Sequence, residues 1–292
     1  MLRRLSVLLL MLASAPGFAG TACQSPSDDC VEVGKWRIGV ALGAGVRTNP
    51  VIGKKDIPLV VLPEIHYQGE RFFIQNLDFG AMLFENSRHQ LNLLLTPGYD
   101  QIFFHRWSPG NFIINGRLAA GTSSAENSWL VPQQPLEAAR AIDTSRLHKR
   151  RMAALAGLEY RLDGEQWFMQ WQALQDISGV HEGQEVRASL TRQWRHKRHQ
   201  LAVTGGASWQ SARVIDYYFG IRPDEVHFSE DAYQAEQGIS TLVRFDWNYA
   251  LNSRWTLRTN ASYKHLASEI RHSPLVTSDH VTTFFIGGVY HF

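Results

Sequence analysis

Two neighbouring stretches near the end of the chain decide the fold: ISTLVRFDWNY at residues 239–249 and WTLRTNASYKH at residues 255–265. In both, large apolar side chains recur at every second position, with polar residues such as Arg244, Asp246 and Lys264 between them. A period of two is that of a β-strand, in which successive side chains point to opposite faces. The stretches therefore predict strands with one apolar and one polar face.

The positions of aromatic and charged residues distinguish a membrane barrel from a soluble β-sandwich. Trp255 and Tyr263 lie near the two ends of one stretch. In a tilted strand, this spacing separates the two residues by about 20 Å along the membrane normal. That distance is close to the spacing of two aromatic girdles. Arg258 and Lys264 would be costly in a sandwich core, but a barrel lumen can hydrate them. We predict an all-β protein: a transmembrane antiparallel up-and-down β-barrel. Its final strand ends on Tyr290 and Phe292, and we interpret them as a C-terminal signal for the outer-membrane assembly machinery.

The first residues predict export. Arg3 and Arg4 precede an apolar run from Leu5 to Leu12 and a small-x-small cleavage site ending at Ala19, so residues 1–19 are predicted to be a cleaved signal peptide. A lipoprotein with its lipid on Cys23 is the less favoured alternative, because Gly20 stands where such signals usually carry a large aliphatic residue.

Residues 20–35 are predicted to form a periplasmic extension. It holds the two cysteines of the chain, Cys23 and Cys30, for which a local disulfide is the default in an oxidising compartment. With no histidine nearby, neither a metal nor any other cofactor is expected. The net charge of +2 and the 19% of charged residues suggest no nucleic-acid partner, whereas nine Trp suit girdles that contact outer-membrane lipid.

Residues 36–292 are then predicted to form the barrel, with short periplasmic turns, longer outer loops and both ends inside. Residues 50–84 contain either three crossings, with a hidden bend near Asn76 to Asp78, or one. Three crossings give twelve strands, which we favour, and one gives ten. Residues 106–147 form a long outer loop with a possible short helix at Leu136 to Ile142, and no other segment has a convincing helical period.

The inward-facing register of these strands carries many charges. The predicted lumen charges are Arg37, Arg151, Arg161, Arg187, Arg195, Arg244, Arg258, Lys264, Glu159, Glu185 and Asp246. They could pair across strands and fill a narrow interior, or the excess of arginine could bias a small pore towards anions. A hydrolytic site at the outer rim would need His265 with Ser208 or Ser211, but no local motif supports that pairing. We therefore expect no enzymatic activity.

Three motifs add a resemblance. Gly69 to Phe73 with Gly80, then Asp216, Tyr217, Tyr218, Phe219 and Gly220 with the Tyr233 region, and finally Ser273 and Pro274 are similar, in order, to the MipA/OmpV family of MltA-interacting outer-membrane proteins. The resemblance implies a non-enzymatic outer-membrane protein. Within the family, roles include a scaffold that joins a lytic transglycosylase to a murein synthase, adhesion and permeability.

The loop motifs could bind a ligand or fold back over the barrel mouth. Together with the barrel reading, the resemblance favours a scaffold or interaction protein in cell-envelope (murein) maintenance. The alternative is a narrow diffusion channel for small, possibly anionic, solutes.

Overall fold

The structure is a computed structural model that describes residues 33–105, 146–226 and 228–292. The signal peptide, Cys23 and Cys30, and the possible helix at Leu136 to Ile142 lie outside the described residues, so these expectations stay predictions.

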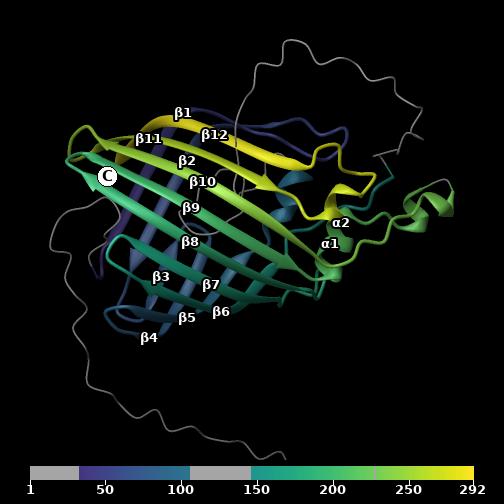
Figure 1. Cartoon of the computed structure of the whole chain (residues 1–292), viewed down its shortest axis with the longest axis horizontal. Helices are drawn as coiled ribbons and strands as arrows, with labels where there is room; N and C mark the ends of the chain where they lie inside the picture. Colours follow the sequence, from purple (N-terminus) through teal and green to yellow (C-terminus); the bar gives the residue numbers. More distant parts are fainter. Residues whose placement is uncertain (1–32, 106–145, 227) are drawn as a thin grey trace, which may run out of the picture.

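Twelve strands form a closed antiparallel barrel in which each strand pairs with its sequence neighbours and the last pairs with the first (Figure 1). This confirms the twelve-strand prediction and excludes the ten-strand alternative. The strands are β1 (Trp36–Arg47), β2 (Ile57–Gln68), β3 (Phe72–Gln75), β4 (Asp78–Glu85), β5 (His89–Pro97), β6 (Ala154–Asp163), β7 (Trp167–Asp176), β8 (Gln184–His196), β9 (His199–Gln210), β10 (Gly238–Ala250), β11 (Trp255–His265) and β12 (His280–His291).

The hidden bend lies at Asn76, which has φ +57° and turns β3 into β4. The expectation of three full crossings in this region is wrong, however, because β3 has only 4 residues. That length covers roughly 13 Å, whereas a crossing needs about 9–11 residues. β3 and β4 are therefore a hairpin in the periplasmic half of the wall, and twelve strands do not mean twelve crossings.

One edge of β2 consequently has no strand partner over its outer half among the described strands, because β3 pairs only with His66 to Gln68. The edge ends at Ile65, whose N–H donates to Asn76 Oδ1 and whose C=O accepts from the Asn76 N–H. Pro63 lies two residues earlier and faces the same side, where it offers no N–H. Proline on an unpaired edge prevents the addition of a foreign strand.

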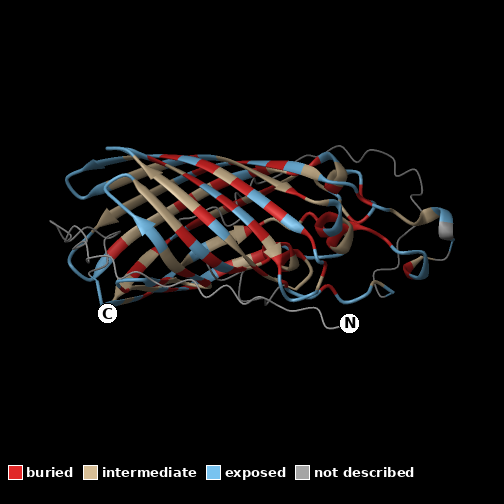
Figure 2. Ribbon diagram, turned by 90° about the horizontal axis from the view of Figure 1, so that it is seen from below, coloured by how far each residue is buried: buried red, intermediate tan, exposed pale blue. Residues whose placement is uncertain are grey.

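Residues alternate between more and less buried along many of the strands, as the colours of Figure 2 show. In β12, Phe285 and Val289 are fully buried inside the barrel, whereas Ile286 is exposed on the outside. Trp255 and Tyr263, at opposite ends of β11, are both exposed on the outer side. This is the arrangement of a barrel with an apolar belt between two aromatic levels.

The seam that closes the barrel between β1 and β12 brings two glycines face to face. Gly43 and Gly287 are register partners. A Cβ atom on Gly43 would collide with the carbonyl oxygen of Ile286, and one on Gly287 would lie 2.6 Å from the carbonyl oxygen of Leu42. The two strands therefore approach more closely here than any larger residue would allow.

The two ends of the barrel differ. Short turns and the C-terminus occupy one end, which is the periplasmic end by the rule for bacterial barrels. The other end carries the helices, namely η1 (Tyr99–Phe103), α1 (Ala212–Phe219), η3 (Pro223–Glu225), η4 (Ser229–Asp231) and α2 (Ser268–Arg271). None of the helices in the described part of the chain is long and apolar enough to span a membrane.

Helix α1 was not expected from the sequence, because its 8 residues are too few to establish a period. Its buried residues are Val214, Ile215, Tyr218 and Phe219. They recur at the i, i+1, i+4 and i+5 spacing of one helical face. This face decides how the outer end is closed.

Candidate functional site

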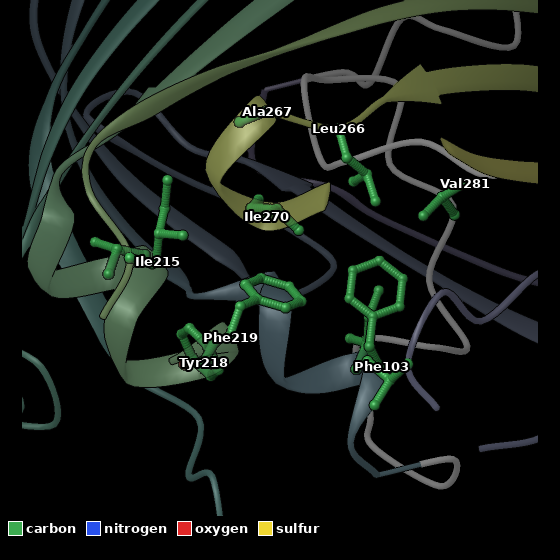
Figure 3. Close-up of a cluster of buried hydrophobic side chains, with 12 residues drawn as sticks. Phe103, Ile215, Tyr218, Phe219, Leu266, Ala267, Ile270 and Val281 are labelled. Atoms are coloured by element: carbon green, nitrogen blue, oxygen red, sulfur yellow. The ribbon is translucent and has the colours of Figure 1, made fainter. Parts of the chain in front are cut away.

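The outer mouth of the barrel is closed by an apolar cluster, the cap, built from loop segments. Figure 3 shows side chains from η1, α1 and α2 and from the ends of β11 and β12 converging there. The buried members of the cap are Val51, Ile102, Phe103, Val214, Ile215, Tyr218, Phe219, Ala235, Leu266, Ala267, Ile270 and Val281. Phe104 packs on Tyr218 and Phe219 with ring centroids 6.3 and 5.9 Å away. The cap therefore has the packing of a small protein core.

The cap brings together two of the motifs that carry the family resemblance. The Ser273 hydroxyl donates to the carbonyl oxygen of Phe219 at 2.5 Å and accepts from the Leu275 N–H at 3.2 Å. Asp216 Oδ1 accepts from the Ala235 N–H at 2.9 Å, which folds the chain back across the mouth. At Gly220 a Cβ atom would collide with Asp216, so the turn that ends α1 requires glycine. Of the two roles considered for the motif, the structure shows it folded over the mouth.

The two tyrosines of the motif hold the segment that leads into β6. The Tyr218 hydroxyl donates to the Arg151 carbonyl at 3.0 Å, and the Arg151 N–H donates to the Tyr217 hydroxyl at 2.9 Å. Burial raises the pKa of Tyr218, so its hydroxyl keeps its proton. The prediction that Arg151 lines the lumen needs correction, because β6 begins only at Ala154 and Arg151 is exposed ahead of it.

A buried ion pair fastens the cap from the side. Arg150 Nη1 lies 2.8 Å from Glu225 Oε1, and the two side chains are 3% and 0% exposed. Arg150 Nη2 also donates to Glu225 Oε2 and to the Gly220 carbonyl, at 3.1 and 2.9 Å. Glu225 further accepts from the N–H groups of His148 and Arg222. Burial acts to raise the pKa of Glu225, but these hydrogen bonds outweigh it and hold the pKa below its ordinary value.

Below the cap, a buried carboxylate organises one side of the lumen. Glu159 is fully buried and accepts hydrogen bonds from three amides, those of Asn92 at 3.0 Å, Gln172 at 2.8 Å and Gln170. Gln172 also lies 3.4 Å from Arg187, which links this group to the next charged pair. The amides fill space that water would occupy in an open pore.

Three ion pairs that include predicted lumen charges lie within single strands, at positions i and i+2. Asp163, a member of one pair, was expected in the turn that follows this strand rather than in the lumen. Glu185 pairs with Arg187 at 2.8 Å, Arg161 with Asp163 at 2.7 Å and Arg244 with Asp246 at 2.6 Å. Asp246 also accepts from Asn260 at 2.7 Å. Pairing was expected across strands, but residues i and i+2 of one strand share the inner face, so their side chains can pair with each other.

One charged pair does cross strands. Arg258 of β11 reaches over β12 and β1 to pair with Glu64 of β2, and its Nε donates to Asn248 at 3.0 Å. Glu64 was not among the predicted lumen residues, because Pro63 obscures the alternation of β2. Arg37 is half-buried near the start of β1, and Arg195 is exposed near the end of β8.

The cavity beneath the cap is small. It has a volume of about 20 Å³ and is lined by residues that include Asp100, Glu185, Arg187 and Lys264. A cavity of that size holds roughly one water molecule. A second buried apolar cluster lies on β1, β2 and β12, which are not among the strands that line the cavity. Its members include Ala41, Leu62, Phe285 and Val289. At the level of this cavity and of this cluster, the interior is filled by side chains of the described residues.

The C-terminal residues close the periplasmic rim. Tyr290 packs edge-on against Trp255 with ring centroids 5.1 Å apart, and against Phe292 at 5.0 Å. The Phe292 N–H donates to the Ile38 carbonyl oxygen at 3.0 Å, and Phe292 itself is 81% exposed. A role of these two residues as an assembly signal remains our proposal.

The residues considered for hydrolysis do not meet. His265 follows the outward register of β11, Ser208 the inward register of β9, and Ser211 accepts from the Gln184 N–H. Within the described ranges, no three His, Cys, Asp or Glu side chains form a group that could hold a metal ion.

Comparison with known proteins places this arrangement in a family. Residues 40–292 match the model of "MltA-interacting protein MipA". OmpV of Vibrio cholerae is 34% identical over 94 residues, which is 32% of this chain and 36% of that protein. Putative outer membrane protein YiaT of Escherichia coli O157:H7 is 23% identical over 86% of this chain and 89% of its own.

MltA-interacting protein of Escherichia coli K12 is 21% identical over 89% of this chain and 91% of its own. Among solved structures, the outer membrane protein OprD of Pseudomonas aeruginosa aligns with a TM-score of 0.35 and 8% identity, over 87% of this chain and 65% of that one. The family match covers most of the strands described above. Two of the relatives that match this chain are named outer membrane proteins. The chain is an outer-membrane β-barrel and belongs to the MltA-interacting protein (MipA) family.

Proposed function

We propose that this barrel is a non-enzymatic scaffold or interaction protein of the cell envelope, acting in murein maintenance. The observation that carries the proposal is the apolar cap packed across the mouth, with hydrogen-bonded charged and amide side chains in the lumen below it. A barrel closed in this way acts through its surfaces rather than through its interior. The name of the relative MltA-interacting protein supports the lytic transglycosylase MltA as one partner. A murein synthase as the second partner is what the family resemblance implies.

Contact with murein enzymes has to come from the periplasmic end. We propose residues 20–35 as the handle, stiffened by a disulfide between Cys23 and Cys30. The described chain joins this segment at the rim, where the Gly34 N–H donates to the Gln68 carbonyl at 2.7 Å. Deletion of residues 20–32 therefore leaves every strand in place.

The test is capture of a purified murein synthase and a purified lytic transglycosylase by the immobilised, folded barrel. We expect the full mature chain to retain both enzymes and the 20–32 deletion to retain at least tenfold less, with unchanged heat-modifiable migration on gels. An unrelated outer-membrane barrel of similar size is the control. Equal capture by that barrel would reject the scaffold, and equal capture by the deletion would reject the handle alone.

Conductance in planar bilayers tests the competing channel function. The one-water cavity beside Lys264 and Arg187 leads us to expect no reproducible single steps. Regular steps with anion preference would instead favour the narrow channel and count against the scaffold.

A further inference from the structure

One arginine of the wall faces the lipid rather than the lumen. Arg192 of β8 is exposed and shares its face with Val186, Leu190 and Trp194, whereas Thr191 on the other face is buried. A charged side chain on the lipid face of a barrel is costly near the bilayer midplane and nearly free at the interface. The position of Arg192 along the strand therefore matters.

Arg192 lies at the periplasmic aromatic level. Its register partner in β7 is Trp167, the first residue of that strand, and its guanidinium carbon lies 5.5 Å from the ring centroid of Trp194. Both tryptophans are exposed on the outer side, 36% and 40% respectively. Tryptophans at this level mark the headgroup region. The guanidinium, beside the Trp194 ring and on a residue in register with Trp167, therefore lies at the depth of lipid phosphates.

The adjacent turn adds further positive charge. Lys197 and Arg198 alone connect β8 to β9, and both are exposed. Lys197 has φ +53°, a conformation that two-residue hairpin turns usually give to Asn or Gly. Among the described residues, no carboxylate forms an ion pair with Arg192, Lys197 or Arg198. The turn thus carries charges where ordinary turn chemistry would favour small neutral residues.

The neighbouring strands continue the aromatic surface. His199 follows the turn, accepts a hydrogen bond from Trp247 Nε1 at 3.1 Å, and lies over the Trp247 and Tyr249 rings at 6.0 and 4.7 Å. This interaction leaves the other ring nitrogen of a neutral His199 as a donor. The surface around Arg192 therefore combines cationic and neutral donors with flat apolar rings.

We propose that Arg192, which lies beside the Trp194 ring and in register with Trp167, binds the phosphate of an anionic phospholipid in the periplasmic leaflet, supported by Lys197 and Arg198. A guanidinium presents paired N–H donors that match phosphate oxygens. The tryptophan rings contact the glycerol and upper acyl carbons, which a free phosphate ion lacks. The site is independent of the scaffold role, since it needs no protein partner.

The test is native mass spectrometry of delipidated, detergent-solubilised protein titrated with phosphatidylglycerol or phosphatidylethanolamine. We expect phosphatidylglycerol to bind at least tenfold more tightly, and Arg192→Gln to lower that affinity about tenfold, as loss of a charge-assisted hydrogen bond implies. Arg88→Gln is the matched control, because it removes an exposed arginine from the periplasmic turn between β4 and β5. Heat-modifiable migration confirms that each variant is folded.

A second variant, Lys197→Asn with Arg198→Gly, gives the turn its favoured residues and should weaken binding without loss of stability. Equal binding of the two lipids, or equal losses in Arg192→Gln and Arg88→Gln, would overturn the proposal. Millimolar inorganic phosphate should leave the bound lipid in place. Complete displacement would overturn the lipid assignment in favour of a site for free anions.

Discussion

The outer mouth and the lumen below it are filled by different kinds of interaction. At the outer mouth, apolar side chains from η1, α1 and α2 form a core in which Phe219 and Ile270 are almost fully buried. Lower in the barrel, charged and amide side chains such as Arg244, Asp246 and Asn260 fill the lumen through hydrogen bonds. The cap depends on contacts between segments far apart in sequence. In the lumen, three of the ion pairs described above form within one strand, and the amide hydrogen bonds join neighbouring strands.

This difference predicts unequal sensitivity to substitution. An apolar core loses transfer energy and gains a cavity when one large side chain is truncated. A charge pair replaced as a unit by small polar groups costs little, because water can take the vacated positions. Substitutions in the cap should therefore be severe, and paired substitutions in the lumen mild.

The largest effect is expected for Phe219→Ala in the cap. Phe219 is 1% exposed, and loss of a buried phenyl ring costs about 3–5 kcal/mol. Urea unfolding in detergent micelles measures the loss, and limited proteolysis should show faster cleavage of the outer loops. Ile177→Ala, at an outer-loop residue that is 62% exposed, should change stability by less than about 0.5 kcal/mol. Porin-like conductance in Phe219→Ala would show that the cap alone closes the barrel.

Next in size is the buried ion pair of the cap. Arg150→Met leaves the Glu225 carboxylate buried without its cation, which should destabilise the protein by about 3 kcal/mol. The matched control is Arg213→Met, because Arg213 and Glu182 pair at 3.3 Å while both remain mostly exposed. The same unfolding assay compares the two. A similar loss in both variants would mean that burial of the pair is irrelevant.

A smaller effect is expected from acid. The pKa of Glu225 is lower in the folded cap than in the unfolded chain, where it is about 4.3. The ionised carboxylate therefore stabilises the cap fully above that pH, and the contribution is lost as the pH falls through the folded pKa. Stability followed from pH 7 to 3 should decline less steeply in Glu225→Gln than in the parent. Parallel curves for the two proteins would contradict the assignment.

The smallest effect is expected in the lumen. The double variant Arg244→Ser with Asp246→Ser removes both charges together, so stability should change by no more than about 1 kcal/mol. Planar-bilayer recordings should show at most a slight rise in conductance while the cap remains folded. Asp246→Ser alone should cost more than the double variant, since it strands Arg244; the reverse order would refute the pair as a unit.

Much of the fold is predictable because a barrel strand faces lipid on one side and the lumen on the other, so its apolar residues recur at every second position. The stretches at 239–249 and 255–265 match β10 and β11 closely, and the bend at Asn76 uses one of the few side chains that readily adopt positive φ. The sequence does show that Arg71 to Gln75 is short for a membrane crossing, but no local pattern shows that β3 ends inside the wall instead of crossing it. Helix α1 is stabilised by packing against η1 and α2, which sequence periodicity cannot reveal.

The site is predictable in part and for similar reasons. The i, i+2 pairs, such as Arg161 with Asp163, are visible in the sequence once strands are assigned, although the sequence analysis predicts pairing across strands. Arg150 and Glu225 are 75 residues apart, and only the folded cap brings them together. Arg192 could have been found by the alternation of β8, since it shares parity with Trp194.

The facing glycines Gly43 and Gly287 have a consequence for biogenesis. First and last strands can meet only after the whole chain has been delivered, so their seam is the final join of the wall. A single methyl group at Gly43 would obstruct that join while the other strand pairings stay satisfied. Such a chain would stall as an almost complete but open sheet. The substitution would therefore impair assembly of the barrel rather than the stability of the assembled protein.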